Sequence, residues 1–377
     1  MARQTLLVPD IFDKRRHMLT VELHRHFEAG LAPETIARLA ARHRVTEVRT
    51  RAGVLVPDVD PQDPESIRRY YRTVASGLGG PGGFTRFVDS FGLPLSVLQS
   101  IEDLEEAVFE QLVACAAAGS LHTELRGSPF TYRDTVNAPL DAIADALVRG
   151  VDRAWAERQV SGTFILAFSR QKGEVQAPVV AALAARLHRA DRPVGLDIAG
   201  FPELTFPPRL FEEALRPARE AGVPLTVHAG EQGCPPEFAA APPDLVLEAV
   251  ECLGARRIGH GTSLAASADA RAAIRDRGIA VECCPVSNER MGFVRVADHP
   301  LPLMLREGLL ATVNTDDPLM FGPFSVAGTL DAMAATLPLS RTDRVQLAQN
   351  GVESAFVTES RRDSLRRRLA GYRDPGV

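Results

Sequence analysis

The chain has 377 residues, of which 45% are hydrophobic and 24% are charged, and its net charge is −5. This balance is typical of a globular protein and gives no reason to expect a nucleic-acid partner. No run of about 20 apolar residues could span a membrane, and residues 1–17 lack the long apolar run and cleavage site of a signal peptide. We therefore expect a soluble, cytoplasmic protein; its oligomeric state cannot be inferred from the sequence.

Short apolar runs recur along the chain, and each is followed by a longer segment with helical spacing. Strands alternating with helices at about thirty-residue intervals indicate βαβ units and a parallel sheet. Eight such units favour one α/β domain over residues 1–377, a (β/α)₈ TIM-type barrel, because the glycine cluster at 77–83 fits neither nucleotide-binding fingerprint of the rival open sheet. The predicted strands are Leu19–His24, Leu121–Arg126, Thr163–Phe168, Val194–Ile198, Val223–His228, Arg257–His260, Ile279–Cys284 and Leu309–Asn314.

The interval between the first and second predicted strands is by far the longest. Helices are predicted over Pro33–His43 and Ile101–Ala118, the first because proline favours a helix start and apolar residues follow at helical spacing. We interpret the part between them, about residues 49–99, as a helical insertion that forms a lid over the barrel mouth. It contains three phenylalanines, Phe84, Phe87 and Phe91. We expect them to be core residues rather than residues that contact a ligand.

Two further features are predicted to be structural. The chain ends in a helical tail over about residues 340–377, whose arginine-rich face we expect to be solvated. Five cysteines without a C-x-x-C pair fit a reducing compartment better than a disulfide scaffold. Cys283 and Cys284 are adjacent at a strand end, so only one can face inward, and we expect both to pack as small apolar groups.

Histidines and carboxylates gather at the ends of the predicted strands. His24 and His26 are two residues apart in the first strand, so both can face the same side. In a barrel, the strand ends meet at the C-terminal mouth, where barrel enzymes place their chemistry. Three histidines and one aspartate would suit Zn²⁺ with a position left for water, whose pKa the metal lowers to near 7. The later strand ends carry His228 and Glu231, His260, and Asp316 and Asp317.

Five short motifs occur in an order and at spacings that are typical of one family. They are His24-Arg-His26, His228-Ala-Gly-Glu231, Arg257-Ile-Gly-His260-Gly, Cys284-Pro-Val-Ser-Asn288 and Asn314-Thr-Asp-Asp-Pro318. As a set, they resemble the adenosine/adenine deaminase family of the amidohydrolase superfamily, over about residues 19–320. Glu124-Leu-Arg126 and Asp197-Ile-Ala-Gly200 are weaker correspondences to the same family.

The resemblance implies a zinc-dependent hydrolytic deaminase, which converts adenosine or a related adenine nucleoside to an inosine-type product and ammonia. It implies one zinc ion per chain, held by His24, His26, His228 and Asp316. Three catalytic roles also follow from it: Glu231 gives a proton to purine N1, His260 orients the water and stabilises its charged form, and Asp317 hydrogen-bonds N7. The backbone at Gly200 would face N3, and Glu28 would bind the sugar end. The partner is thus a small-molecule purine.

The first motif departs from the family pattern just after its second histidine. Glu28 stands where adenosine deaminases typically have an aspartate that holds the ribose 5′-hydroxyl, and glutamate is more usual in relatives that act on adenine or modified adenosines. We rank adenosine-type nucleosides first, adenine second and N9-extended derivatives such as aminodeoxyfutalosine third. Arg68, Arg69 and Arg72 could meet the anionic tail of such a derivative, although an exposed helix face is the favoured interpretation.

Three other functions are weighed against this one. A dinuclear site of the phosphotriesterase or dihydroorotase type needs a carboxylated lysine at the fourth strand end, where the sequence has Asp197; the chain has only Lys14 and Lys172. A cytidine-type deaminase needs P-C-x-x-C after its H-x-E motif, and none occurs. A non-catalytic, zinc-containing purine-binding protein would be expected to have lost a metal-ligating residue or the acidic residue that protonates the purine. The sequence retains all of them.

The one H-x-E triplet, at residues 122–124, therefore needs a different explanation. We expect Glu124 to be a buried partner for an arginine such as Arg126 or Arg170. His122 is expected to be a core or pocket-lining residue.

Overall fold

The computed structural model describes residues 18–231 and 240–371. At its centre is a sheet of eight parallel strands in the order β1-β4-β5-β6-β7-β8-β9-β10. Each strand lies within two residues of a predicted one, so all eight predictions are confirmed. The strands are β1 (Thr20–His26), β4 (Ser120–Gly127), β5 (Gly162–Ser169), β6 (Gly195–Ala199), β7 (Leu225–Ala229), β8 (Arg257–His260), β9 (Ala280–Cys283) and β10 (Leu310–Val313).

The sheet closes on itself between its first and last strands. Arg25 and Asp316 form a parallel bridge. The N–H of His26 donates to the carbonyl of Asp316 at 2.9 Å, and the N–H of Asp316 donates to the carbonyl of His24 at the same distance. The fold is therefore the predicted (β/α)₈ barrel, and the carboxyl ends of its strands share one mouth.

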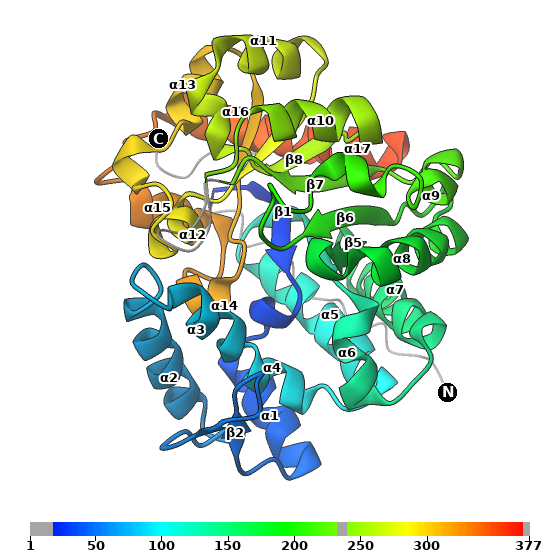
Figure 1. Ribbon diagram of the computed structural model, residues 1–377, viewed down its shortest axis with the longest axis vertical. Helices are drawn as coiled ribbons and strands as arrows, with labels where there is room; N and C mark the ends of the chain where they lie inside the picture. Colours follow the sequence, from blue (N-terminus) through cyan, green and yellow to red (C-terminus); the bar gives the residue numbers. More distant parts are fainter. Residues whose placement is uncertain (1–17, 232–239, 372–377) are drawn as a thin grey trace.

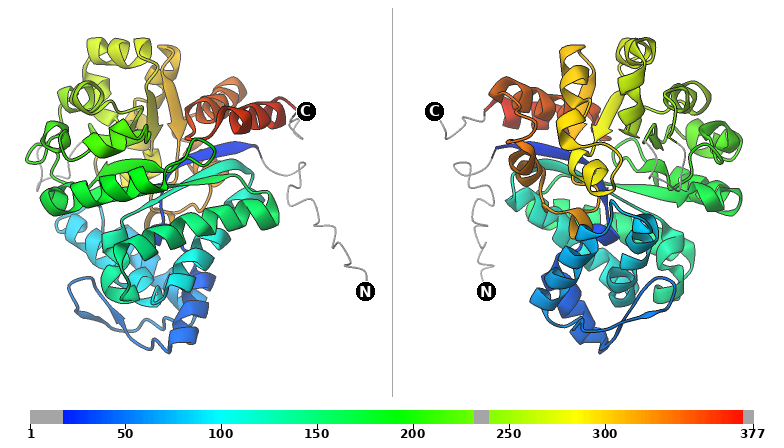
Figure 2. Two further views of the ribbon diagram at one scale, coloured as in Figure 1. Left: turned by 90° about the vertical axis from the view of Figure 1, so that its right-hand side faces the viewer. Right: turned by 60° about the vertical axis from the view of Figure 1, so that its left-hand side comes forward.

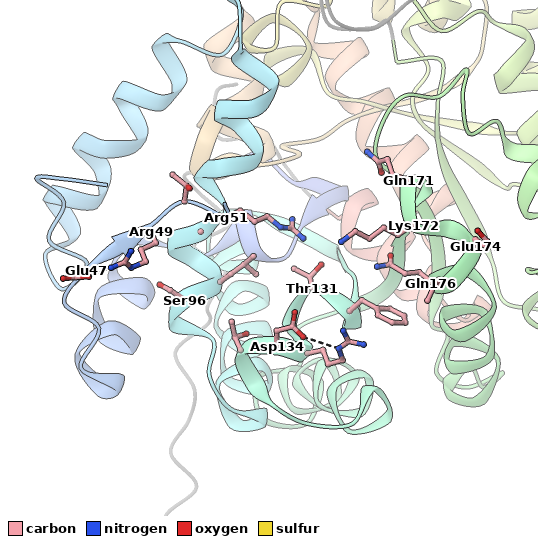
Figure 3. A pocket seen from close by; sticks show the side chains of 17 residues that line it. Glu47, Arg49, Arg51, Ser96, Thr131, Asp134, Gln171, Lys172, Glu174 and Gln176 are labelled. Atoms are coloured by element: carbon pink, nitrogen blue, oxygen red, sulfur yellow. Dashed lines mark hydrogen bonds and ion pairs between the residues drawn. The ribbon is translucent and has the colours of Figure 1, made fainter. Parts of the chain in front are cut away.

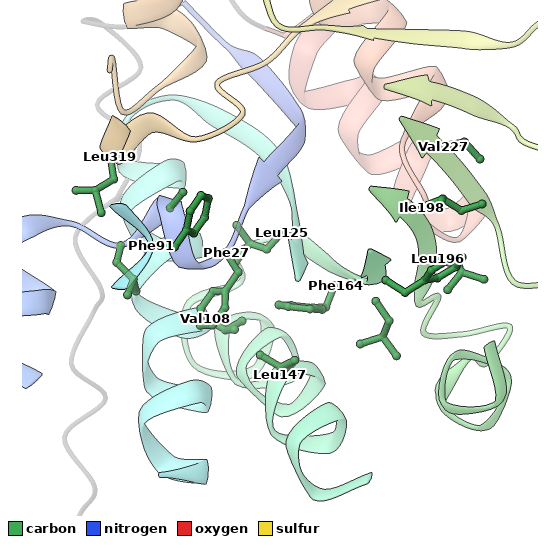
Figure 4. Packing of buried hydrophobic residues seen from close by; sticks show 14 of the residues in the cluster. Phe27, Phe91, Val108, Leu125, Leu147, Phe164, Leu196, Ile198, Val227 and Leu319 are labelled. Carbon is green, nitrogen blue, oxygen red and sulfur yellow. The ribbon is translucent and has the colours of Figure 1, made fainter. Parts of the chain in front are cut away.

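Helices surround the barrel and follow its strands in turn (Figure 1). Most of the buried apolar side chains of strands and helices form one main cluster, part of which, including Phe27, Phe164 and Leu319, is drawn in Figure 4. Among the described residues, no helix is both long and apolar enough to span a membrane. The helices after β4 are α6 (Pro129–Val136), α7 (Leu140–Arg158), α8 (Gly173–Leu187), α9 (Arg216–Glu220), α10 (Asp244–Leu253), α11 (Ala268–Asp276), α12 (Pro285–Arg290), α13 (Leu301–Arg306), α14 (Pro318–Phe321) and α15 (Val326–Met333).

The long segment between β1 and β4 begins and ends with the two predicted helices, α1 (Pro33–His43) and α5 (Ile101–Ala117). Between them lie a short antiparallel hairpin and three helices. The carboxylate of Asp63 accepts hydrogen bonds from the N–H groups of Glu65 and Ser66, which caps the first of these helices. These elements are β2 (Val48–Arg49), β3 (Leu55–Val56), α2 (Pro64–Ser76), α3 (Gly83–Ser90) and α4 (Gly92–Val97).

The three phenylalanines of this segment pack against other aromatic rings. Phe87 stacks on Phe321 of α14, with ring centroids 5.6 Å apart and planes 9° from parallel. Phe84 meets Phe201 edge-on at 5.6 Å, and Phe91 meets Phe87 at 5.1 Å. Such pairs contribute about 0.5–1.5 kcal/mol beyond the area they bury. Because α14 directly follows Asp317, these contacts pack the segment against the residues at the barrel mouth.

Two C-terminal helices, α16 (Arg341–Ser354) and α17 (Glu359–Ala370), lie beside the start of β1 (Figure 2). Val352 and Leu365 of these helices join Leu19 and Val21 in a second apolar cluster, separate from the main core. Residues 341–370 thus cover part of the barrel end opposite its mouth. The last six residues of the predicted tail, 372–377, lie outside the described residues.

Candidate active site

Four nitrogen and oxygen atoms converge at the barrel mouth. Nε2 of His228 lies 3.1 Å from Nε2 of His24 and 3.3 Å from Nε2 of His26. Oδ1 of Asp316 lies 3.3 Å from Nε2 of His24 and 3.4 Å from Nε2 of His26. Strand β1 supplies two of these residues from alternate positions of one face, β7 supplies the third, and the residues after β10 supply the aspartate.

The spacing of these four atoms fits a single zinc ion. A tetrahedral ion with bonds of about 2.0–2.1 Å has its ligand atoms about 3.3–3.4 Å apart. Oδ1 of Asp316 is buried, and none of the described residues hydrogen-bonds to it. Burial lowers the pKa of His26 to about 3 and also lowers that of His228, so both rings are neutral and can offer a lone pair. A buried acceptor and these two facing lone pairs suit a cation between them.

A second layer of carboxylates orients two of the imidazoles. Nδ1 of His24 lies 2.7 Å from Oε2 of Glu282, and Nδ1 of His228 lies 3.1 Å from Oδ1 of Asp197. Arg126 donates to both carboxylates, at 2.8 and 3.0 Å. Burial alone would raise the pKa of Glu282, but the charges of nearby arginines hold it well below its usual range. Ionised carboxylates accept the Nδ1 protons, which leaves each Nε2 lone pair directed at the site.

Glu124 is a buried partner of an arginine, as expected, but the arginines named for this role are wrong. Neither Arg126 nor Arg170 binds its carboxylate; instead Nη2 of Arg257 bonds it, while Nε of Arg257 bonds Glu282. Arg126 reaches the second layer described above, and Arg170 donates to the carbonyl of His228. The parallel register sets these partners, because it decides which inward side chains share a layer of the barrel.

Two of the three predicted catalytic residues, Glu231 and His260, lie together beside the four metal-facing atoms, and Asn288 contacts both. Oε1 of Glu231 lies 3.3 Å from Nδ1 of His260, and Nδ2 of Asn288 donates to Oε1 of Glu231 at 3.2 Å. Burial raises the pKa of Glu231 well above its usual range, and the charges of Asp316 and Glu203 raise it further. Burial lowers the pKa of His260 well below its usual range. Burial therefore favours the protonated form of Glu231 and the neutral form of His260.

Glu203 holds the backbone on which Glu231 stands. Its two carboxylate oxygens accept the N–H groups of Gly230 at 2.8 Å and Glu231 at 3.0 Å. A side chain at Gly230, where φ is +68°, would lie 2.3 Å from the hydroxyl of Ser263, so this close turn requires glycine. Glu203 was not predicted, because it lies in the loop after β6 and belongs to none of the motifs.

Backbone strain is concentrated at two of the site residues. His260 and Asp316 have φ values of +63° and +61°, in the left-handed region that non-glycine residues avoid. Such residues persist where the surrounding structure fixes them. The hydroxyl of Ser287 donates to Oδ2 of Asp316 at 2.6 Å, which holds this carboxylate in place.

The other two predicted acidic site residues, Asp317 and Glu28, lie at the same mouth. Asp317 has a carboxylate oxygen within 4.8 Å of ligand atoms of His26 and Asp316, and its Oδ1 is buried and not hydrogen-bonded by any described residue. Burial raises its pKa well above the usual range, and the charges of Asp316 and Glu28 add to this. The hydroxyl of Tyr132 on α6 donates to Oε2 of Glu28 at 2.8 Å.

Gly200 follows β6 with a φ of +91°. A Cβ there would lie 2.5 Å from Oε1 of Gln171 and 3.1 Å from the hydroxyl of Ser169. Only glycine thus fits at this place. Gly200 lies at the mouth, beside Gln171 of the loop after β5.

Both adjacent cysteines are buried and behave as thiols. Burial raises the pKa of Cys284 well above its usual range and raises that of Cys283 to about 12. Sγ of Cys283 lies against the sulfur of Met304 at 3.8 Å, and Sγ of Cys284 donates to the carbonyl of Glu282 at 3.5 Å. Cys284 lies within 4.8 Å of His24, His260 and Asp316, but a buried thiol with a raised pKa is a weaker ligand than the neighbouring imidazoles.

Comparison with known proteins assigns the family. A model of the family described as adenosine deaminase matches residues 20–372. The chain belongs to the adenosine deaminase family. It is therefore a member of the amidohydrolase superfamily, and a hydrolase that acts on carbon–nitrogen bonds of cyclic amidines.

Members of the adenosine deaminase family with two different substrates resemble the chain about equally well. An adenosine deaminase of Klebsiella pneumoniae is 31% identical over 350 residues, which cover 93% of this chain and 97% of that one. An adenine deaminase of Rhodopseudomonas palustris is 31% identical over 360 residues, 95% of each chain. The crystal structure of an adenine deaminase from Arthrobacter aurescens superposes with a TM-score of 0.76 at 28% identity, covering 93% of this chain and 98% of that one. The chain is thus a purine deaminase by family.

Proposed function

We propose that the protein is a zinc-dependent deaminase that adds water to C6 of an adenine nucleoside and releases ammonia, with adenosine or a related nucleoside ahead of free adenine. One observation carries the proposal: Glu231, a buried carboxyl group whose pKa burial raises, stands beside three histidines and an aspartate whose atoms are spaced for one metal ion. A proton donor and a metal site are what hydrolysis of an aromatic amidine requires.

His24, His26, His228 and Asp316 would hold one Zn²⁺ per chain. When bound there, the metal activates water as a nucleophile near neutral pH. The chain itself fixes the position of that water through the rigid second layer of Glu282 and Asp197. This layer holds the imidazoles in one tautomer and one orientation.

Glu231 would donate its proton to N1 of the purine. The ring is weakly basic and its C6 becomes electrophilic only as N1 gains a proton, so binding of the protonated ring stabilises the transition state more than the substrate. Asn288 donates to Oε1 of Glu231, which leaves the other oxygen to carry the acidic proton. The bond from C6 to the amino nitrogen breaks, and a new C6–O bond forms in its place.

His260 would accept the proton of the attacking water and return it to the leaving amine. Its neutral ring at neutral pH suits a base. Asp317 would donate a hydrogen bond to N7, because N7 is an acceptor and the raised pKa of Asp317 keeps the carboxyl protonated. Its unpartnered Oδ1 supports this role.

Glu28 and Gly200 would meet the sugar side of the purine. The hydrogen bond from Tyr132 fixes one oxygen of Glu28 and thereby its direction. A positive φ at Gly200 leaves backbone, without a side chain, to approach N3 closely. Free adenine is the second candidate substrate, because a relative named adenine deaminase is as similar to this chain as those named adenosine deaminase.

The proposal is tested by release of ammonia from adenosine, 2′-deoxyadenosine, adenine and 5′-methylthioadenosine by zinc-loaded protein. We expect kcat/KM to be higher for the nucleosides than for the base. A tenfold or greater preference for adenine, about 1.4 kcal/mol in transition-state binding, would overturn the order of substrates and leave the deaminase assignment standing. Zinc binding without ammonia release from any of these purines would instead favour a non-catalytic binding protein.

A further inference from the structure

A cavity of about 820 Å³ opens beside the catalytic mouth, within the range of about 300–1,000 Å³ found for ligand pockets. The hairpin and α4 of the 49–99 segment form one side of it, and α6 and the residues after β5 form the other (Figure 3). The cavity is unusual for its charged lining. Its basic residues are Arg49, Arg51, Arg133 and Lys172, and its acidic residues are Glu47, Asp134 and Glu174.

Two of the four basic side chains are neutralised by neighbours. Nη2 of Arg49 lies 3.0 Å from Oε2 of Glu47. Nε of Arg133 lies 3.3 Å from Oδ1 of Asp134. An anionic ligand could bind either arginine only by competing with its carboxylate partner.

Arg51 and Lys172 are different. Within residues 18–231 and 240–371, no carboxylate forms an ion pair with either side chain. Their charged ends nevertheless point toward one another across the cavity, with Thr131 below them (Figure 3). Like charges that face each other repel, and an anion placed between them relieves this repulsion.

The cavity borders the sugar side of the proposed substrate site. Thr131 precedes Tyr132, whose hydroxyl binds Glu28. Gln171, which lines the cavity, lies against Gly200. The charge of Arg51 also reaches Glu28, where it partly offsets the larger effect of burial, which raises the pKa of that carboxyl. The cavity therefore adjoins residues that contact Glu28 and Gly200, the two residues proposed for the sugar side.

We infer that Arg51 and Lys172 form a subsite for an anionic group, a phosphate or a carboxylate, at the outer end of the substrate's N9 substituent. The inference rests on the proposed function and narrows its substrate to adenine nucleosides with an acidic group on the 5′ side. Arginine offers a planar fork that matches both oxyanions, and lysine adds a point charge. Two of the three arginines considered from the sequence, Arg68 and Arg72, instead pair with Glu65 on α2.

The experiment compares kcat/KM of the zinc-loaded enzyme for adenosine and three derivatives that differ from it only at the 5′ position. The four compounds are adenosine, adenosine 5′-monophosphate, adenosine-5′-carboxylic acid and 5′-amino-5′-deoxyadenosine. We expect one or both anionic nucleosides to exceed adenosine by about tenfold or more, as a charge-assisted hydrogen bond allows, and the cationic one to fall below it. The two anionic substrates distinguish a phosphate from a carboxylate subsite.

Variants test the two cations themselves. Arg51→Gln and Lys172→Gln should each lower the ratio of kcat/KM for the preferred anionic nucleoside to kcat/KM for adenosine by about tenfold, and Lys172→Glu should lower it further. Both side chains are exposed, so these variants should fold. The matched control is Arg133→Gln, which removes an equal charge from the same cavity but one already paired with Asp134; its ratio should stay as in the parent enzyme.

The possible failures are distinguishable. If adenosine is deaminated but neither anionic nucleoside is preferred, or if Arg133→Gln lowers the ratio as much as Lys172→Gln, the subsite is wrong and the proposed function stands. If no nucleoside releases ammonia, the proposed function fails and the subsite fails with it.

Discussion

Oδ1 of Asp197 lies 3.1 Å from Nδ1 of His228, on the side of the ring away from the metal-facing atoms. The carboxylate is fully buried and Arg126 holds its other oxygen at 3.0 Å. Burial opposes its ionisation, but the charges of His228 and Arg126 lower the pKa of Asp197 below its usual range. It therefore accepts the Nδ1 proton at all ordinary pH values and keeps the Nε2 lone pair available.

Asp197→Asn should weaken zinc binding by about 10–100-fold, the usual cost of losing such a partner of a metal ligand. The amide oxygen of the asparagine is a weaker acceptor for the Nδ1 proton of His228. The substitution also removes one of the two negative charges that Arg126 contacts. Competition with a chromogenic chelator measures the change. Asp331→Asn, at an exposed position on α15, is the control and should bind zinc as the parent does. Equal zinc affinity of the two variants would contradict the role of Asp197.

Purified protein should contain one tightly bound zinc ion per chain. Four donor atoms surround one point, and Asp197 occupies the place of the bridging lysine that a dinuclear site would need. Elemental analysis of protein expressed with ample metal measures the ratio. Two ions per chain, or none, would disprove the single site. Removing the ion should also lower the melting temperature, because a ligand that binds only the native state stabilises it.

Glu231→Gln should fold and retain zinc but lose about 10²–10⁴-fold in kcat. Glutamine keeps the shape of the side chain and can still contact Asn288, but an amide cannot deliver a proton to N1. Ammonia release and zinc content are measured on the same preparation. Near-full turnover at neutral pH would show that another group supplies this proton. Glu213→Gln, an exposed change, should leave turnover unaltered.

The pH dependence of kcat/KM should respond to Glu203. The working form of Glu231 is protonated, so activity is present below its pKa and is lost as the pH rises through that value. Because the charge of Glu203 helps to raise the pKa of Glu231, Glu203→Gln should move the alkaline limb to lower pH, while its remaining carbonyl oxygen can still accept a backbone N–H. An alkaline limb that stays in place or moves upward would contradict this coupling.

Arg257→Met should destabilise the fold by about 3–5 kcal/mol, because it leaves the buried carboxylates of Glu124 and Glu282 without their shared cation. Urea-induced unfolding measures the loss. Adding Glu124→Gln to this variant should restore part of the stability, since one uncompensated charge is removed. Arg216→Met breaks an exposed pair with Glu213 and should change stability by no more than about 0.5 kcal/mol.

The eight strands and the residues at their ends could be predicted because both depend on local patterns. His24 and His26 share a face by the two-residue period of a strand, and Asp316 follows a strand whose end must lie at the mouth. The partner of Glu124 could not be predicted in the same way. Arg126 is two residues away and Arg257 is 133 residues away, and only the register of the closed barrel selects the distant one.

The anionic subsite shows the same limit. Arg51 and Lys172 belong to two loops, and neither has a motif or a spacing that marks it. Arg68, Arg69 and Arg72 were considered because they are close together in the sequence. Binding of an anion depends instead on which cationic side chains of the folded protein face a cavity without an ion pair. Whether a charged side chain has an ion-pair partner depends on the folded structure, so it cannot be read from the sequence.

Closure of the barrel has a consequence for the order of folding. The seam joins Leu23 to Asn314, which are 291 residues apart, and the same seam brings the histidines of β1 to Asp316. Contacts of such long range form late, because the chain between them must first be ordered. A nascent or partly folded chain therefore has no complete zinc site. Metal capture should coincide with the last step of folding, and zinc should slow unfolding without speeding the earlier steps.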